Sequence, residues 1–187
     1  MAIIHLLDDA DMPTDVLALA REVERQYGFI PNILRGVANC PELFAPFVRY
    51  WGGVYHSPAI GPRLRAFVAL GVAFSQECEY CVGPMTQSAL AAGLTIAEIQ
   101  RLQSRQLAHF TSKEQLAYRF SCRLTLDPAG IDAVMRGELR AAFTDAELVN
   151  LALAVGTYNM TGRFLKALDI DVDESVTVRP DAISQPA

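Results

Sequence analysis

Three helix-start signals constrain the fold of this chain more than any other feature. In each, a threonine is followed three residues later by a glutamate, so that the hydroxyl and the carboxylate can satisfy free amides of a first helical turn reciprocally. The three pairs are Thr95 with Glu98, Thr111 with Glu114, and Thr144 with Glu147. Each precedes an apolar run of helical spacing. Because the hairpin dipeptides Asn-Gly and Asp-Gly are also absent from the sequence, we predict an all-α fold.

Two further helices, and the extent of the helix that follows Thr144, are predicted from apolar spacing and from start and stop residues. Asp15 to Gln26 alternates apolar and charged residues between Pro13 and Gly28, which indicates a surface helix. Residues 64–74 and 145–168 are apolar around much of the helix, so each is expected to be buried in the core or against another subunit. We therefore expect a homo-oligomer.

Length and charge indicate the class of protein. The 187 residues fit one domain, placed at residues 1–170, with 171–187 as an extended or disordered tail. The net charge is −5 with no basic run, which excludes a nucleic-acid partner. The longest apolar run, 67–74, is too short to cross a bilayer, and acidic residues stand where a signal peptide would be basic. A cytoplasmic protein that does not bind membranes is predicted.

The segment CEYC places Cys78 and Cys81 close enough to form a small disulfide. We expect Pro84 in the first turn of a helix that ends at Gly93, which places Cys81 near its amino end, where the helix dipole favours a thiolate. Glu77 and Glu79 flank Cys78 and oppose that effect.

The spacing alone leaves redox, metal-binding and structural roles open. Zinc would need two more ligands, and the chain offers only scattered histidines at His5, His56 and His109. We predict no metal and no cofactor, with both His56 and His109 at the surface or in turns. Cys40 and Cys122 are expected to pack as small apolar residues.

Three long segments resemble the carboxymuconolactone decarboxylase superfamily, in its alkylhydroperoxidase D-like (AhpD-like) branch. RLRAFVALGVAFSQECEYCVGPMTQSALAAGLTIAEI is similar to the core of these proteins, YGFIPNILRGVANCPELFAPFVRYWGGV to their entry region, and FTDAELVNLALAVGTYNMTGRFLKALDI to their closing helix. Together they cover residues 27–170. The resemblance implies a helical fold that assembles as a trimer or hexamer. It also implies antioxidant peroxidase activity.

By the same resemblance, Cys81 is the thiol that attacks a hydroperoxide, and Cys78 resolves the resulting sulfenic acid as a disulfide. An external dithiol would then reduce the pair. Active relatives carry a glutamate twelve residues before the first cysteine and a histidine four after the second. Those positions hold Ala66 and Met85 here, and neither side chain can accept a proton, so weak or specialised activity is expected.

Other residues can help or line the pocket, each against a plainer structural role. They are Tyr80, Glu77 and Glu79 beside the cysteines, Met85 one turn on, and Tyr158, Asn159 and Arg163 on the closing helix. Two alternatives to a redox enzyme remain: a non-catalytic ligand-binding or assembly protein on this fold, and a lyase like the lactone decarboxylases.

Overall fold

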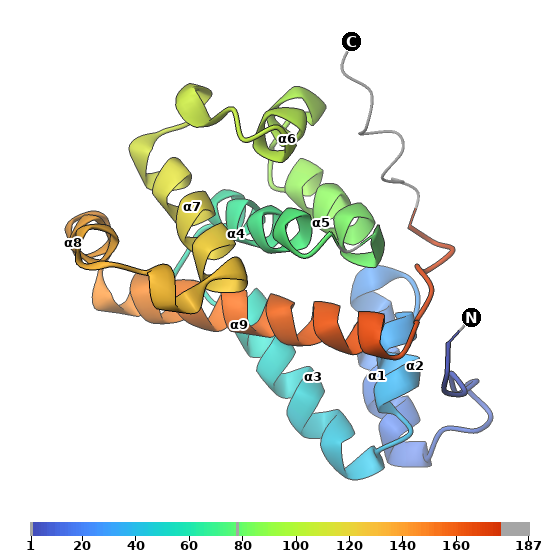
Figure 1. The fold of residues 1–187 in the computed structure, drawn as a ribbon. Coiled ribbons are helices and arrows are strands. Elements are labelled where there is room, and N and C mark those ends of the chain that lie inside the picture. The colour runs from blue at the N-terminus through green and yellow to red at the C-terminus, as the bar shows by residue number, and fades with distance from the viewer. Residues whose placement is uncertain (1, 78, 177–187) are drawn as a thin grey trace.

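The chain folds into helices joined by short loops (Figure 1). The computed structural model describes residues 2–77 and 79–176, and this part contains helices and no strand, which confirms the all-α prediction. The helices are α1 (Thr14–Tyr27), α2 (Asn32–Val37), α3 (Pro41–Tyr55), α4 (Pro62–Ser75), α5 (Glu79–Ala91), α6 (Ile96–Gln103), α7 (Ser112–Leu126), α8 (Ala133–Ala142) and α9 (Asp145–Ala167). Two single 3-10 turns, at Leu107–His109 and Pro128–Gly130, flank α7. None of the described helices is long and apolar enough to cross a bilayer.

All three predicted capping boxes form, at the starts of α6, α7 and α9. Two of their glutamates also bind one cation from α4. Arg63 pairs with Glu98 at 2.6 Å and with Glu114 at 2.7 Å. The hydrogen bond from Arg63 is the main cause that lowers the pKa of Glu98. Arg63 therefore ties the starts of α6 and α7 to the start of α4.

Helix α4 is the centre of the molecule and packs against α5, α7 and α9 (Figure 1). Its residues 66–73 are all buried, which confirms the prediction for 64–74. Gly71 permits the close approach of α7, since a Cβ there would lie 2.1 Å from the Ser121 hydroxyl. The apolar helix α4 thus packs against three other helices, and one of these, α5, begins at the cysteine turn.

Helix α9 is buried on one side only. Its opposite side exposes an apolar stripe of Val149, Leu153 and Met160, whose exposed fractions are 59%, 42% and 42%. Tyr50 of α3, itself 45% exposed, lies beside the stripe and its hydroxyl is 3.4 Å from that of Thr157. Within one chain the helix is therefore not surrounded, and a second subunit on this side remains a prediction.

Helices α1 to α3 enclose a separate apolar cluster at the end of the molecule where α9 finishes (Figure 1). After α9 the chain continues along α2, where the Asn32 amide binds Asp173 at 2.6 Å. Residues 171–176 contain no helix or strand, but Asp173 and Val176 are buried. The predicted tail therefore begins with a packed segment, and its residues 177–187 lie outside those described.

Candidate thiol site

Cys81 lies in the first turn of α5, as the sequence predicts. The amides of a first turn lack helical partners, and the positive end of the helix dipole favours a thiolate there. Cys81 is disulfide-bonded in the structure, and Cys78 lies outside the described residues. The placement of Pro84 is corrected: α5 begins at Glu79, so Pro84 is inside the helix rather than in its first turn. Because proline has no amide hydrogen, the carbonyl of Tyr80 lacks its usual helical bond.

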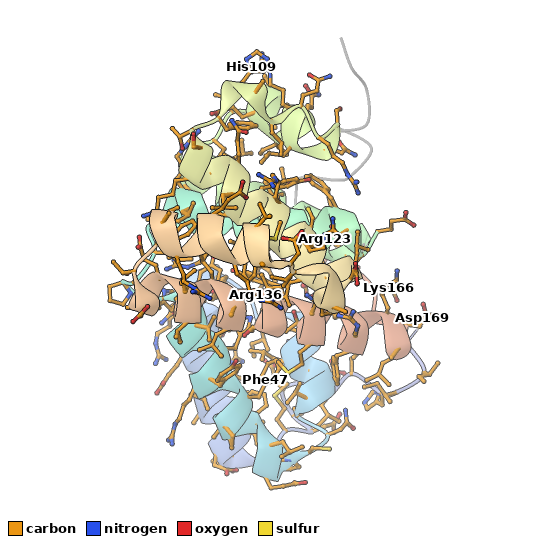
Figure 2. All side chains as sticks on the ribbon, turned by 60° about the vertical axis from the view of Figure 1, so that its left-hand side comes forward. Phe47, His109, Arg123, Arg136, Lys166 and Asp169 are labelled. Carbon is orange, nitrogen blue, oxygen red and sulfur yellow. The ribbon has the colours of Figure 1, made fainter. Side chains whose placement is uncertain are left out.

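Helix α9 approaches the cysteine turn at Gly162. A Cβ at this position would lie 3.4 Å from Cys81 Sγ and 2.0 Å from Gln76 Oε1. Gln76 Nε2 donates to Asn159 Oδ1 at 2.8 Å, while Gln76 Oε1 is buried without a hydrogen-bond partner. Lys166, at the end of α9 (Figure 2), donates to the Gln76 carbonyl at 2.9 Å. Helix α9 therefore holds the turn that precedes Cys81 in place.

A cavity of about 330 Å³ opens in front of Cys81. It lies between α1, α2, α3, α5, α9 and the segment after α9, and most of its lining is apolar or aromatic. The described lining residues are Gln26, Tyr27, Phe29, Pro31, Ile33, Trp51, Tyr55, Tyr80, Cys81, Pro84, Met85, Gln87, Ser88, Ala91, Thr161, Leu165, Asp173 and Val176. Its volume is at the lower end of the usual range for small-molecule sites, about 300–1,000 Å³.

Three rings form one wall of this cavity. Trp51 and Tyr55 stack on α3 with centroids 5.6 Å apart, and Tyr27 of α1 lies 5.7 Å from Trp51. The Tyr55 hydroxyl hydrogen-bonds Ser88 Oγ at 2.6 Å, which joins this wall to α5. The Tyr27 hydroxyl is buried without a partner, and burial raises the pKa of Tyr27 above its ordinary value, so it stays neutral.

Tyr80 and Asp173 form the polar edge of the cavity. The Tyr80 hydroxyl donates to Asp173 Oδ2, and the Asn32 amide donates to Asp173 Oδ1 at 2.6 Å. Burial raises the pKa of Asp173, although these two hydrogen bonds and the charge of Arg35 oppose the rise. Burial also raises the pKa of Tyr80. The site thus holds a carboxyl group whose proton affinity is higher than usual.

The two positions of the expected relay differ in their access to the cavity. Met85 lines the cavity one turn beyond Cys81, whereas Ala66 is buried in the core of α4 and is not among the cavity residues. No lysine, arginine or histidine occurs among the described lining residues, and Asp173 is their one carboxylate. Glu77 is exposed in the preceding turn, with a φ of 49°. The side chain of Glu79 lies outside what is described.

The other sequence-predicted pocket residues lie elsewhere. Asn159 binds Gln76 and Thr125, and the exposed Arg163 donates back to Asn159. Tyr158 is buried and lines a smaller neighbouring cavity of about 260 Å³, together with Arg65 and His56. On α9 it is Thr161 and Leu165 that reach the main cavity instead.

The remaining histidines and cysteines are distant from this chemistry. His109 is exposed at the end of the molecule away from Phe47 of α3 (Figure 2). Cys122 is partly buried against the core, but Cys40 is exposed and free, so its predicted packing role is wrong. Within residues 2–77 and 79–176, no three His, Cys, Asp or Glu side chains are grouped to hold a metal.

Sequence reasoning missed Asp173, Gln76 and the aromatic wall. Asp173 is far from the cysteines in sequence and lies in a segment read as tail. Trp51 and Tyr55 are four residues apart, so their spacing indicated one helix face. Nothing in the sequence indicated which helix that face would meet.

Comparison with known proteins supplies the wider context. Residues 41–121 match the Carboxymuconolactone decarboxylase family. The chain is similar to that family over this segment, which runs from the start of α3 into α7. Its AhpD-like fold agrees with a solved structure of an uncharacterized peroxidase-related protein from Ralstonia eutropha, described as an alkylhydroperoxidase AhpD core, with a TM-score of 0.83, 16% identity and coverage of 94% of each chain.

Two further similar proteins are informative. The uncharacterized protein YnjA of Escherichia coli is 26% identical over 148 residues, which is 78% of this chain and 81% of YnjA. The debrominase Bmp8, solved in complex with 2,3,4-tribromopyrrole, matches with a TM-score of 0.83 and 19% identity over 98% of this chain and 100% of Bmp8. At these structural identities the likeness concerns the fold.

Proposed function

We propose that this protein is a thiol-dependent oxidoreductase that reduces organic hydroperoxides by cycling Cys78 and Cys81 between dithiol and disulfide. The observation that carries the proposal is the position of Cys81, in the first turn of α5 and in the lining of the apolar cavity. A thiol there is favoured as a thiolate and has room for a substrate beside it. The AhpD-like fold supports the same chemistry.

The reaction balances with the residues present. The Cys81 sulfur attacks the outer peroxide oxygen, an S–O bond forms as the O–O bond breaks, and the alcohol leaves with a proton. Cys78 then displaces water from the sulfenic acid and closes the disulfide. A second dithiol restores the pair by exchange and is itself oxidised. The net reaction consumes one hydroperoxide and one external dithiol per cycle.

Asp173 and Tyr80 are the proposed substitutes for the missing proton relay. Both line the cavity with Cys81 and are hydrogen-bonded to each other. In this scheme Tyr80 is the group next to the reacting atoms and Asp173 acts through it, accepting the thiol proton and returning it to the departing alkoxide. A buried carboxyl with a raised pKa suits this exchange better than an exposed one.

The test is the rate at which fully reduced protein loses its Cys81 thiol to cumene hydroperoxide, followed by peptide mapping. Cys40 is exposed and free, so it reports the rate of an ordinary thiol in the same molecule. We expect Cys81 to react at least about a hundredfold faster than Cys40, the scale of one catalytic proton transfer, and to form a disulfide with Cys78. Equal rates at Cys81 and Cys40 would reject the peroxidase and favour a binding protein.

A second set of variants tests the relay. Asp173→Asn and Tyr80→Phe should lower the rate of Cys81 oxidation, and Asp173→Asn should also abolish the fall in rate at low pH that protonation of Asp173 causes. Glu77→Gln is the control, because Glu77 is exposed and outside the cavity. A pH profile of Asp173→Asn that matches the wild type would remove Asp173 from the mechanism.

A second candidate reaction is reductive dehalogenation, which uses the same dithiol. It is favoured by the likeness to a debrominase over nearly the whole chain and by the aromatic wall of the cavity. A carbon–bromine bond would be replaced by carbon–hydrogen while two thiols become a disulfide, with bromide and a proton released. Bromide release from tribromopyrrole by reduced protein, without added peroxide, would support it. The lyase alternative is disfavoured, since the described lining lacks a cation to bind a carboxylated lactone.

A further inference from the structure

The cavity in front of Cys81 has a more selective chemistry than hydroperoxide reduction requires. A small peroxide needs only the sulfur and a proton donor. The cavity that Cys81 lines instead contains stacked rings and an unsatisfied hydroxyl, and its described lining has no cation. We infer that the substrate of the Cys81 site is a neutral, flat aromatic molecule that carries a hydrogen-bonding oxygen or nitrogen. The inference rests on the proposed role of Cys81 as the reacting atom.

The aromatic wall argues for a flat ligand. Tyr27, Trp51 and Tyr55 lie with centroids 5.6 to 6.4 Å apart, and all three line the cavity. Rings prefer offset-stacked or edge-to-face neighbours at such distances. Cys81 and Met85 also line the cavity, and they share one face of α5 because they are four residues apart. A ring placed between the wall and this face would contact the wall and the sulfur together.

The charges argue for a neutral ligand. Asp173 is the only charged residue in the described lining, and both its oxygens accept hydrogen bonds, from Tyr80 and from the Asn32 amide. An anionic substrate would lose its hydration without gaining a counter-charge, and would meet Asp173. Fatty-acid hydroperoxides and other carboxylates are therefore poor candidates. The cavity's modest volume also disfavours a long acyl chain.

The Tyr27 hydroxyl argues for a polar group on the ring system. It is buried and has no hydrogen-bond partner, and an unpartnered buried hydroxyl is unfavourable until a ligand supplies the partner. A tyrosine hydroxyl is protonated at physiological pH, and burial raises the pKa of Tyr27 further, so it can either donate or accept. A hydroperoxide, alcohol or pyrrole nitrogen would each serve.

Trp51 provides the measurement, since it is the only tryptophan in the chain. The Trp51 fluorescence of the Cys81→Ser protein would be measured while 2-phenyl-2-propanol is added. Two control ligands would be titrated in the same way: 4-isopropylbenzoate, which is aromatic but anionic, and tert-butanol, which is a neutral alcohol without a ring. We expect 2-phenyl-2-propanol to bind at least about tenfold more tightly than either control ligand. A tenfold ratio of affinities is typical of one favourable contact in an apolar pocket. Tyr27→Phe should weaken it several-fold, whereas Tyr50→Phe, outside the cavity on α3, should not.

The outcomes separate this inference from the proposed function. Binding is measured without a reactive Cys81, so selective binding together with slow thiol oxidation would keep the inference and reject the peroxidase. Equal binding of the benzoate or of tert-butanol, or no saturable change with any ligand, would overturn the inference. It would also be overturned if wild type oxidises rapidly but reacts equally fast with hydrogen peroxide and cumene hydroperoxide.

Discussion

Replacing Gly162 with alanine tests whether the close approach of α9 holds the cysteine turn in place. The added methyl would lie 2.0 Å from Gln76 Oε1, so Gln76 must move and give up its 2.8 Å bond to Asn159. Losing such a bond costs about 0.5–1.5 kcal/mol, and stranding a buried polar group costs about 1–3 kcal/mol. In a helix interior, alanine is more stabilising than glycine by up to about 1 kcal/mol, which partly offsets these losses.

Gly137→Ala provides the matched control. Gly137 is exposed inside α8, and nothing lies within 4 Å of its would-be Cβ, so only the helix-propensity gain applies. By urea unfolding of the reduced proteins, we expect Gly162→Ala to be about 1.5–4.5 kcal/mol less stable than Gly137→Ala, because the helix-propensity gain is common to both variants and only the two losses at Gln76 remain. Cys81 should also react several-fold more slowly with hydroperoxide. Equal stabilisation of both variants, with unchanged Cys81 reactivity, would refute the reasoning.

Three further perturbations follow from contacts already described. Because burial raises the pKa of Asp173, the folded state holds that proton more tightly than the unfolded state, and stability is lost as pH rises from about 3.9 through the raised value. Asp173→Asn should therefore gain stability over wild type across that window in urea unfolding, and a constant difference from pH 4 to 8 would contradict this. Arg63→Met should cost about 1 kcal/mol through its two partly exposed ion pairs, less in 1 M NaCl, whereas Arg119→Met, with one exposed pair at 3.4 Å, should change little. Leu153→Glu on the exposed stripe of α9 should dissociate the predicted trimer or hexamer in sedimentation velocity, and an unchanged mass would exclude this stripe as the interface.

The helices were predicted well because the residues that determine where a helix starts and whether it is buried lie close together in the sequence. A capping box needs only Thr144 and Glu147, and a buried helix such as α4 needs only a continuous apolar run. The first turn of α5 was likewise expected at Cys81. Pro84 was misplaced because proline marks a first turn only by preference, and here the chain starts α5 earlier and tolerates one missing helical bond.

The candidate site was harder to predict because it is built from distant segments. Asp173 meets Tyr80 through the path that the chain takes after α9, and no local pattern encodes that path. Cysteine is usually a buried residue type, so Cys40 was expected to pack in the core. Its exposure instead depends on how α2 meets α3. Tyr158 and Asn159 share a helix with Gly162, yet rotation of α9 about its axis decides which of them faces the cavity. Such facts depend on tertiary packing.

The bracing of the cysteine turn by α9 has a consequence for biosynthesis. Gln76 is held by Asn159 and Lys166, and Tyr80 by Asp173, so these three contacts to the turn all come from the last part of the chain. During translation Cys78 and Cys81 leave the ribosome long before these residues are made. The nascent chain therefore carries two thiols that can pair with other cysteines or be oxidised before the contacts to Gln76 and Tyr80 form. A chain truncated before Asp145 should accumulate more mixed disulfides at Cys78 and Cys81 than the full-length protein does.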